Sequence, residues 1–414
     1  MNRRQFLMAS GTLGLSAWPL SLEEGLWNPC LDGLPRALAD HDIVRAAWEG
    51  IDPAAFWDCH VHLIGVGDSN GGLWITPAMQ SLWHPVQYLQ RIFYQNASCA
   101  ERQGHVDEDF LARLLRLQAE LPAGNKVMLL AFAHHHDETG AVDLASSAYY
   151  SSNAAARDLA RRYPAQFEWI ASIHPYQPDC VTQLEAVVRD GARAVKWLPS
   201  AMGIDPAAPR CDPFYAALAR LDVPLLSHGG KELAVHGGAH DEFNNPLRLR
   251  RALGHGVRVI VAHCASLGSY PDIDRGRDAS PVEAFALFAR LMDEARYEKL
   301  LYGDLSAVTQ VNRLGPALNT VLERDDWHAR LVNGSDYPLP GVVPLFALSR
   351  MAGQGLITTE QAVLCSEIRR YNPLLFDFVL KRCLRSRGKG LAPGVFESRQ
   401  VFGAGEPSRR QSGA

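Results

Sequence analysis

Short apolar segments alternate with amphipathic stretches along most of the 414-residue chain, and this alternation constrains the fold more than any single motif. Eight segments have the length and composition of strands: 56–64, 126–134, 168–174, 192–198, 224–228, 257–263, 300–305 and 330–336. Most are bounded by Gly, Pro or polar turns, as expected of strands buried on both faces of a parallel sheet. Between them lie amphipathic stretches such as 154–163, 180–190, 246–255, 281–299 and 312–324. This rhythm predicts an α/β fold, a (β/α)8 TIM barrel.

The length and composition favour one large domain. Barrels run long as single domains, and no Ser/Gly-rich linker or run of charge divides the middle of the chain. We assign residues 52–380 to the barrel, with a long insertion after the first strand at 65–125 that either walls the substrate site or packs as a surface helix. A hydrophobic content of 47% supplies a core, and a net charge of −4 gives no basic surface for nucleic acid or anionic membrane. We expect a small-molecule substrate, and the sequence leaves open whether the protein forms a homo-oligomer.

Both ends of the chain are predicted to lie outside the barrel. Residues 1–22 contain Arg3-Arg4-Gln5-Phe6-Leu7 ahead of a weakly apolar run, which resembles a twin-arginine export signal and is short for a stable membrane span. This predicts a periplasmic protein, whereas a disordered basic N-terminus would leave the protein in the cytoplasm. Residues 386–414 are rich in Gly, Ser, Arg and Pro and predict a disordered tail. The eight cysteines are scattered and define no disulfide framework.

Candidate metal ligands end one predicted strand after another. They are His60, His62, Lys196, His228, His263 and Asp336. Side chains alternate faces along a strand, so His60 and His62 point the same way and can hold one ion, with Asp58 on their face and Cys59 on the opposite face. A single H-x-H pair is weak evidence in a chain with 15 His. The succession is stronger evidence, because the C-terminal strand ends form the active-site face of a barrel.

Several of these strand ends are similar to the motifs of a known family. They read Asp58-Cys59-His60-Val61-His62, Ser227-His228-Gly229-Gly230, Ala262-His263-Cys264 and Gly334-Ser335-Asp336-Tyr337-Pro338. Together they resemble the amidohydrolase superfamily, in the group of TIM-barrel metal-dependent hydrolases and decarboxylases related to aminocarboxymuconate semialdehyde decarboxylase. The resemblance covers residues 52–380. It implies a divalent metal bound by His60, His62 and Asp336, with His228 and His263 as further ligands or as groups that polarise the substrate.

The resemblance leaves the number of ions open, because it implies two roles for Lys196. In binuclear amidohydrolases, a lysine that ends the fourth strand is carboxylated and bridges two metals. Many mononuclear relatives use no ligand from this strand, and Lys196 would then bind an anionic substrate or pair with a carboxylate. We expect one or two divalent ions, with zinc as the first expectation and manganese as the second.

The ligand set predicts a metal-dependent hydrolase that attacks the carbonyl of a lactone, ester or amide with metal-bound hydroxide. A bound divalent ion lowers the pKa of its water from 15.7 to about 7. Asp336 is the expected proton acceptor, and the metal or His263 would stabilise the oxyanion. The alternative is a metal-dependent decarboxylase, a carbon-carbon lyase of an aromatic or unsaturated acid. A non-catalytic metal-binding barrel ranks third, because Asp336 is present with the ligands.

Candidate substrate contacts flank the metal residues. We assign Trp197, beside Lys196, and His236 and His240, which lie in a Gly-rich loop that can approach a ligand closely. Arg248 can clamp a carboxylate, although an arginine-rich helix is more often a solvated face. The tandem histidines 134–136 and His174 either line the pocket or only bond loop carbonyls.

Overall fold

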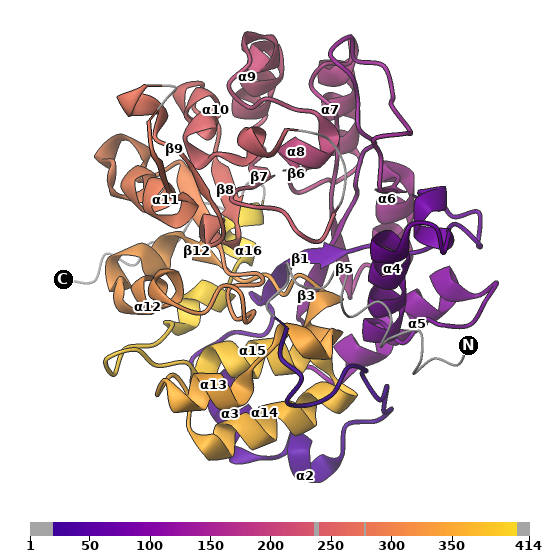
Figure 1. Ribbon diagram of the computed structural model, residues 1–414, viewed down its shortest axis with the longest axis vertical. Coiled ribbons are helices and arrows are strands. Elements are labelled where there is room, and N and C mark those ends of the chain that lie inside the picture. The colour runs from indigo at the N-terminus through magenta and orange to yellow at the C-terminus, as the bar shows by residue number, and fades with distance from the viewer. Residues whose placement is uncertain (1–19, 236–239, 277–278, 404–414) are drawn as a thin grey trace.

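The eight predicted strands form one parallel barrel in the computed structural model, which describes residues 20–235, 240–276 and 279–403 (Figure 1). In chain order they are β1 (Trp57–His62), β3 (Lys126–Leu130), β5 (Phe167–Ile170), β6 (Val195–Trp197), β7 (Leu225–His228), β8 (Val259–Ala262), β11 (Leu301–Asp304) and β12 (Leu331–Val332). They pair as two sheets, β1–β3–β5 and β6–β7–β8–β11–β12. Parallel bridges between Ala171 and Val195 and between Val61 and Tyr337 join these sheets into a ring. The predicted TIM barrel is confirmed.

Helices follow the strands and cover the outside of the barrel. The predicted amphipathic stretches form α6 (Asn153–Arg162), α7 (Cys180–Arg189), α10 (Arg250–Gly254), α11 (Ala284–Asp293) and α12 (Pro316–Glu323), and α9 (Asp212–Arg220) lies beside α7. On another side, α13 (Leu348–Gly353), α14 (Thr359–Tyr371) and α15 (Pro373–Cys383) gather with α2 (Arg36–Ala39) and α3 (Asp42–Trp48) (Figure 1). Among the described residues, no helix combines the length and apolar character that crossing a membrane requires.

The insertion after β1 forms part of the active-site wall. It folds into β2 (Leu73–Ile75), α4 (Pro85–Ala97) and α5 (Val106–Ala119). Strand β2 pairs antiparallel with β4 (Tyr149–Ser151), which belongs to the connection after β3, so the two insertions support each other. Ile75, Arg91 and Tyr94 from the first insertion and Tyr149 from the second line the pocket described below. The insertion thus lines the pocket, as the first of the two alternatives for residues 65–125 predicted, and a role in contacting substrate stays a prediction.

The predicted disordered tail is ordered as far as Gly403. Residues of this segment form α16 (Arg399–Phe402), and Val401 and Phe402 are buried with the inward-facing side chains of the barrel, including Trp57 at the start of β1. The prediction was wrong here because it relied on the polar, Gly-rich composition of the whole segment. Two adjacent apolar residues, Val401 and Phe402, nevertheless fill the N-terminal end of the barrel. Residues 404–414 of the predicted tail and residues 1–19 of the predicted signal lie outside the described residues.

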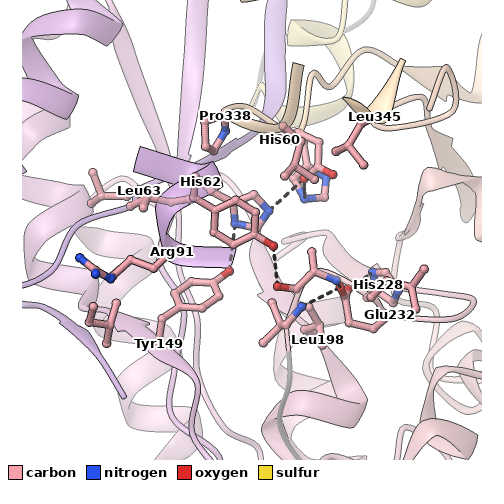
Figure 2. Close-up of a pocket in the computed structure, with 18 of the residues that line it drawn as sticks. His60, His62, Leu63, Arg91, Tyr149, Leu198, His228, Glu232, Pro338 and Leu345 are labelled. Atoms are coloured by element: carbon pink, nitrogen blue, oxygen red, sulfur yellow. Dashed lines mark hydrogen bonds and ion pairs between the residues drawn. The ribbon is translucent and has the colours of Figure 1, made fainter. Parts of the chain in front are cut away.

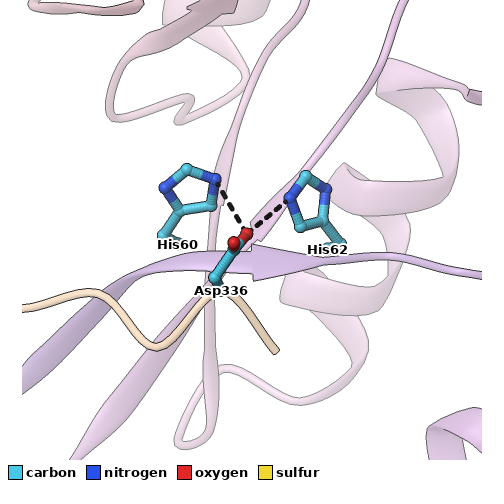
Figure 3. Close-up of side chains that lie close together, drawn as sticks. All are labelled: His60, His62 and Asp336. Atoms are coloured by element: carbon cyan, nitrogen blue, oxygen red, sulfur yellow. Dashed lines mark hydrogen bonds and ion pairs between the residues drawn. The ribbon is translucent and has the colours of Figure 1, made fainter. Parts of the chain in front are cut away.

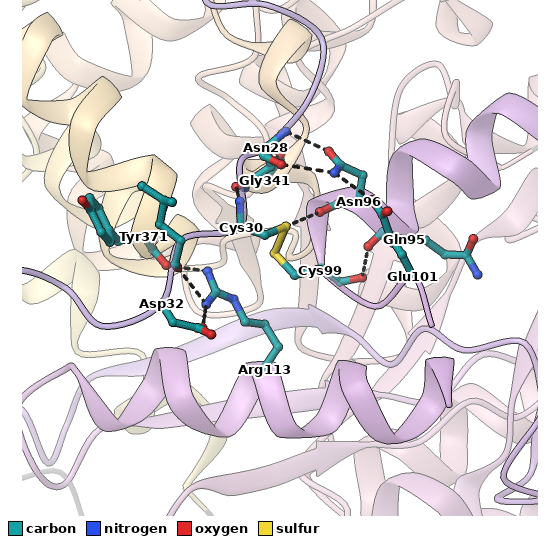
Figure 4. The surroundings of a disulfide bond; sticks show 12 residues. Asn28, Cys30, Asp32, Gln95, Asn96, Cys99, Glu101, Arg113, Gly341 and Tyr371 are labelled. Carbon is teal, nitrogen blue, oxygen red and sulfur yellow. Dashed lines mark hydrogen bonds and ion pairs between the residues drawn. A yellow bond between two sulfur atoms is a disulfide. The ribbon is translucent and has the colours of Figure 1, made fainter. Parts of the chain in front are cut away.

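A disulfide between Cys30 and Cys99 ties the segment before the barrel to the end of α4 (Figure 4). Hydrogen bonds reinforce the contact, because Asn28 N donates to Asn96 Oδ1 at 2.8 Å and Asn96 Nδ2 donates to Asn28 O at 3.2 Å. The two cysteines are 69 residues apart in the sequence, so no spacing motif marks them. The other six cysteines are buried and free, as small apolar side chains often are.

Candidate active site

The six predicted ligands meet in one pocket at the C-terminal ends of the strands (Figure 2). His60 and His62 come from β1, Lys196 from β6 and His228 from β7, while His263 directly follows β8 and Asp336 follows β12. The pocket measures about 1130 Å³ with its open mouth. Residues separated by up to 276 positions therefore share one site, as the barrel rule requires.

Two imidazoles converge on one carboxylate oxygen at the centre of this pocket (Figure 3). His62 Nε2 lies 3.0 Å from Asp336 Oδ1, and His60 Nε2 lies 3.5 Å from the same oxygen. The other ring nitrogens are engaged, since His60 Nδ1 lies 2.7 Å from Asp304 Oδ2 and His62 Nδ1 lies 3.2 Å from Tyr149 Oη. A partner on Nδ1 fixes the ring and leaves Nε2 as the ligand atom. This donor set fits a divalent ion between His60, His62 and Asp336.

A β-bulge in β1 changes which side chains share a face. Asp58 pairs with Val127 and Val61 with Leu129, so β1 has one residue more than β3 over this interval. Cys59 and His60 therefore both face the barrel interior, and Asp58 does not share the face of the histidines, contrary to the prediction. Asp58 Oδ1 instead accepts hydrogen bonds from His60 N at 3.1 Å and Ser335 N at 2.8 Å. Cys59 does not line the pocket.

Lys196 is 1% exposed and lies beside the candidate ion site. Its Nζ is 3.2 Å from His60 Nε2. Burial lowers the pKa of Lys196, and the nearby carboxylates of Asp304 and Asp336 oppose this effect. A lysine with a lowered pKa is more easily deprotonated, which both carboxylation and proton transfer require. The position suits a bridging group and a substrate cation alike, so both roles stay predictions.

The two remaining histidines differ in the nitrogen that they offer to the pocket. His263 Nδ1 lies 3.0 Å from Ser306 O, so Nδ1 carries the proton and Nε2 keeps its electron pair. This tautomer favours a ligand role for His263 over hydrogen-bond donation to a substrate oxygen. His228 Nε2 donates to Gly230 O at 3.1 Å, and its Nδ1 lies 3.4 Å from Glu232 Oε2. Burial lowers the pKa of both histidines well below the usual range.

Asp336 is held as a carboxylate in a strained backbone. Burial opposes its ionisation, but the imidazoles of His263 and His60 and the hydrogen bond from His62 outweigh burial and hold the pKa of Asp336 well below its usual range. Its φ is 64°, and that of His263 is 57°. Non-glycine residues rarely adopt the left-handed region, and those that do are often found at functional sites.

Several residues in or directly behind the pocket were not among the predicted site residues, and Asp304 is the buried one that contacts His60 from behind. Asp304 is the last residue of β11, so the strand-end rule alone would have identified it. Its pKa is lowered because the contacts with His60 and Ser306 outweigh the opposing effect of burial. Arg313 and Glu232 lie on loops after strands, and Arg91 comes from the first insertion. No pattern in the sequence marks those three.

The predicted substrate contacts do not line this pocket within the described residues. Trp197 is fully buried in the outer core, and its Nε1 donates to Ile173 O, because it faces away from Lys196, its neighbour on β6. His240 is paired with Glu242 and lines a separate hollow. Arg248 Nη1 donates a hydrogen bond to Asp205 Oδ1 at 2.7 Å. These three assignments are wrong, and His236 lies outside the described residues.

Two of the three tandem histidines bond loop carbonyls, which was one of the two alternatives, whereas His134 stacks on Tyr150 and its buried Nδ1 has no hydrogen-bond partner among the described residues. His135 Nδ1 lies 3.1 Å from Ala201 O, and His136 Nδ1 lies 3.0 Å from His134 O. His174 Nε2 lies 2.8 Å from Met202 O. These rings therefore organise the connections after β3 and β5 beside the pocket without entering it.

Comparison with protein families decides the relationship that the site suggests. The model of the family described as Amidohydrolase matches residues 57–344, which include all six candidate ligands. The chain belongs to the amidohydrolase family. Members of this family are enzymes that use divalent metal ions, in agreement with the donor set of this amidohydrolase. No curated protein sequence matches the chain significantly.

Solved structures similar to this amidohydrolase include proteins with two kinds of assigned activity. One is a putative 2-pyrone-4,6-dicarboxylic acid hydrolase from Pseudomonas putida, with 16% identity, a TM-score of 0.42 and coverage of 84% of this chain and 97% of that one. Another is 5-carboxyvanillate decarboxylase from Sphingomonas paucimobilis, with 10% identity, a TM-score of 0.46 and coverage of 84% and 98%. A 5-carboxyvanillate decarboxylase from Novosphingobium aromaticivorans, solved with manganese, shows 12% identity, a TM-score of 0.44 and coverage of 84% and 96%.

Proposed function

We propose that this amidohydrolase is a metal-dependent hydrolase of a small lactone, ester or amide. The observation that carries the proposal is the convergence of His60 Nε2 and His62 Nε2 on Asp336 Oδ1 inside a largely apolar pocket. Zinc suits this set of two imidazoles and a carboxylate, and manganese is the second candidate. A divalent ion held there would polarise the substrate carbonyl and lower the pKa of water at the site.

The side chains of the pocket divide the remaining work. Asp336 is ionised and adjoins both imidazoles, so it can take a proton from the attacking water and return it to the leaving group. Asp304 and Tyr149 hold the rings of His60 and His62 in the orientation that a ligand needs. Tyr149, Leu198 and Leu345 give the pocket apolar walls that exclude bulk water (Figure 2).

Metal analysis with a substrate screen tests the proposal. The purified protein is expected to contain a divalent ion, to hydrolyse a member of a panel of lactones, esters and amides, and to lose that activity to a chelator and regain it with zinc or manganese. His62→Ala should abolish both metal and activity. His105→Ala, at an exposed histidine paired with Glu108, should change neither and serves as the matched control. Activity that survives complete removal of metal would contradict the proposal.

The same pocket supports a second candidate, a metal-dependent decarboxylase. The observation that favours it is the presence of two buried cations, Lys196 and Arg313, beside a carboxylate that can exchange protons. A substrate acid bound by such cations could be protonated on carbon as carbon dioxide leaves. The substrate screen therefore includes aromatic acids and records carbon dioxide release, which distinguishes the two reactions.

The role of Lys196 predicts how many ions the site holds. If Lys196 is a carboxylated bridge, Lys196→Ala should lower the metal content from about two ions to one or none, and bicarbonate with a short acid should restore part of it. Metal is measured per polypeptide by mass spectrometry. Lys126→Ala is the control, because Lys126 pairs with Glu168 at the other end of the barrel. A single ion in both wild type and Lys196→Ala would assign Lys196 to substrate binding or structure.

We further propose that the protein is exported through the twin-arginine route. The disulfide between Cys30 and Cys99 supports the proposal, because stable disulfides form in oxidising compartments. Replacing Arg3 and Arg4 together by lysine should retain the folded protein in the cytoplasm with both cysteines reduced, as cell fractionation and thiol alkylation would measure. The same change at the exposed pair Arg161 and Arg162 is the control. Wild-type protein found at full length in the cytoplasm would contradict export.

A further inference from the structure

The loop after β11 concentrates buried polar atoms that have no hydrogen-bond partner. Within the described residues, Thr309 Oγ1, Gln310 Nε2, Asn312 Oδ1 and Arg313 Nε all lack one, although they lie within five consecutive positions. Folded proteins leave few buried polar atoms unpaired, because each costs free energy. Four unpaired polar atoms on one short loop therefore indicate that a ligand could supply their hydrogen-bond partners.

Three of these residues line the active-site pocket, and one of them is a buried cation. Arg313 is 8% exposed, and within the part of the chain that the structure describes its side chain makes one hydrogen bond, from Nη1 to Ser266 Oγ at 3.0 Å. No carboxylate lies within ion-pair distance of its guanidinium among the residues described by the structure. Gln310 and Asn312 join it in the pocket wall. The carboxylates of Glu232 and Asp336 act on this guanidinium only from beyond ion-pair distance. A buried charge without a direct ionic partner is costly, so Arg313 is placed to bind an anion.

Arg91 is the other arginine of the pocket, and its guanidinium has hydrogen-bond partners within the protein. Its Nε donates to Met79 O at 2.8 Å, and its Nη1 donates to Gln95 Oε1 at 3.2 Å. Figure 2 places Arg91 on the side of the pocket away from His228 and Glu232. Arg91 therefore belongs to the structure of the wall and provides an internal comparison for Arg313.

We propose that Gln310, Asn312 and Arg313 form a subsite for a carboxylate of the substrate. A guanidinium beside an amide donor matches the two oxygens of a carboxylate, and the amide of Asn312 can rotate to present its nitrogen. Apolar side chains and the ring of Tyr149 complete the pocket and suit a flat, apolar body. This inference rests on the proposed function, because it makes the substrate an acid whose second group reacts at His60, His62 and Asp336.

Binding of benzoate and of its neutral counterpart benzamide tests the subsite without catalysis. In titration calorimetry on the metal-loaded wild-type protein, benzoate should bind more tightly than benzamide. Arg313→Met should lower benzoate affinity by about 10- to 100-fold and leave benzamide affinity within about twofold, as expected from loss of a charge-assisted bond. Arg91→Met, the matched control, should preserve the ratio of the two affinities. Equal affinities in wild type, or a ratio that Arg313→Met does not change, would overturn the subsite.

Two milder variants keep the test decisive if Arg313→Met does not fold. Arg313→Lys retains the charge but not the planar fork, and Gln310→Leu removes only the amide donor, so each should lower the benzoate preference several-fold. An unchanged preference in both would overturn the subsite.

The outcomes also separate this inference from the proposed function. Hydrolysis of neutral substrates with no carboxylate preference would remove the subsite and leave the hydrolase intact. An Arg313-dependent benzoate preference in a protein without hydrolase activity would leave the anion site and remove the hydrolase.

Discussion

Asp336→Asn is expected to lower kcat by about 10²- to 10⁴-fold, the usual contribution of general acid-base catalysis. The amide keeps the shape of the side chain and one oxygen near His62, but it cannot accept a proton from water. The fold and most bound metal should therefore survive. Steady-state kinetics at measured, full metal occupancy, with any substrate that the screen identifies, would test this expectation.

A surface aspartate provides the matched control for this substitution. Asp326 is ion-paired with Arg324 at the protein surface, so Asp326→Asn should leave kcat unchanged. If the Asp336→Asn variant instead had nearly wild-type kcat at full metal occupancy, Asp336 would have no part in proton transfer, and the decarboxylase or a non-catalytic barrel would become the better account.

Lys381→Met is expected to lower the free energy of unfolding by about 3–5 kcal/mol, the usual cost of breaking a buried ion pair. Lys381 Nζ lies 2.5 Å from Asp377 Oδ2 and donates to Gly334 O at 2.6 Å, and both side chains are buried. The variant leaves the Asp377 carboxyl without its cation and frees the loop that carries Asp336. Chemical denaturation would measure the loss.

Two further variants separate a specific loss from a general one. Asp377→Leu combined with Lys381→Met removes both partners and should recover part of the stability, because well-packed apolar residues often replace a buried pair without penalty. Lys389→Met, at a partly exposed lysine bound to Asp325, should change stability by less than about 1 kcal/mol. A Lys381→Met variant as stable as the Lys389→Met control would show that the buried pair contributes little.

The barrel and the ligand positions could be predicted from sequence because both follow from local pattern. Each strand is a short apolar run, and parallel barrel strands present their C-terminal ends on one face. His228 and His263 were therefore found without any knowledge of their contacts. The same rule should have excluded Trp197, because neighbours on a strand face opposite sides and Lys196 already faces inward.

Other features depend on contacts between distant segments that local pattern does not encode. The partner of Cys30 lies at the end of α4, beyond the first barrel strand. Arg313 is recognisable only because its surroundings leave it unpaired, since arginine in a loop is ordinarily a solvated residue. The bulge between Asp58 and Val61 arises in the pairing of β1 with β3, so the alternation within β1 alone predicted the wrong face for Asp58.

The position of Asp58 connects ion binding with completion of the fold. One oxygen of Asp58 bonds both His60 N in the first strand and Ser335 N, next to Asp336, after the last strand. The distance between the candidate ligands His60 and Asp336 is thus set where the first and last strands of the barrel meet. An unfinished chain that ends before β12 has the two histidines but neither Asp336 nor the strand that fixes their geometry. Retention of the ion would therefore report that the last strand has docked, and a nascent barrel should release metal that the finished one keeps.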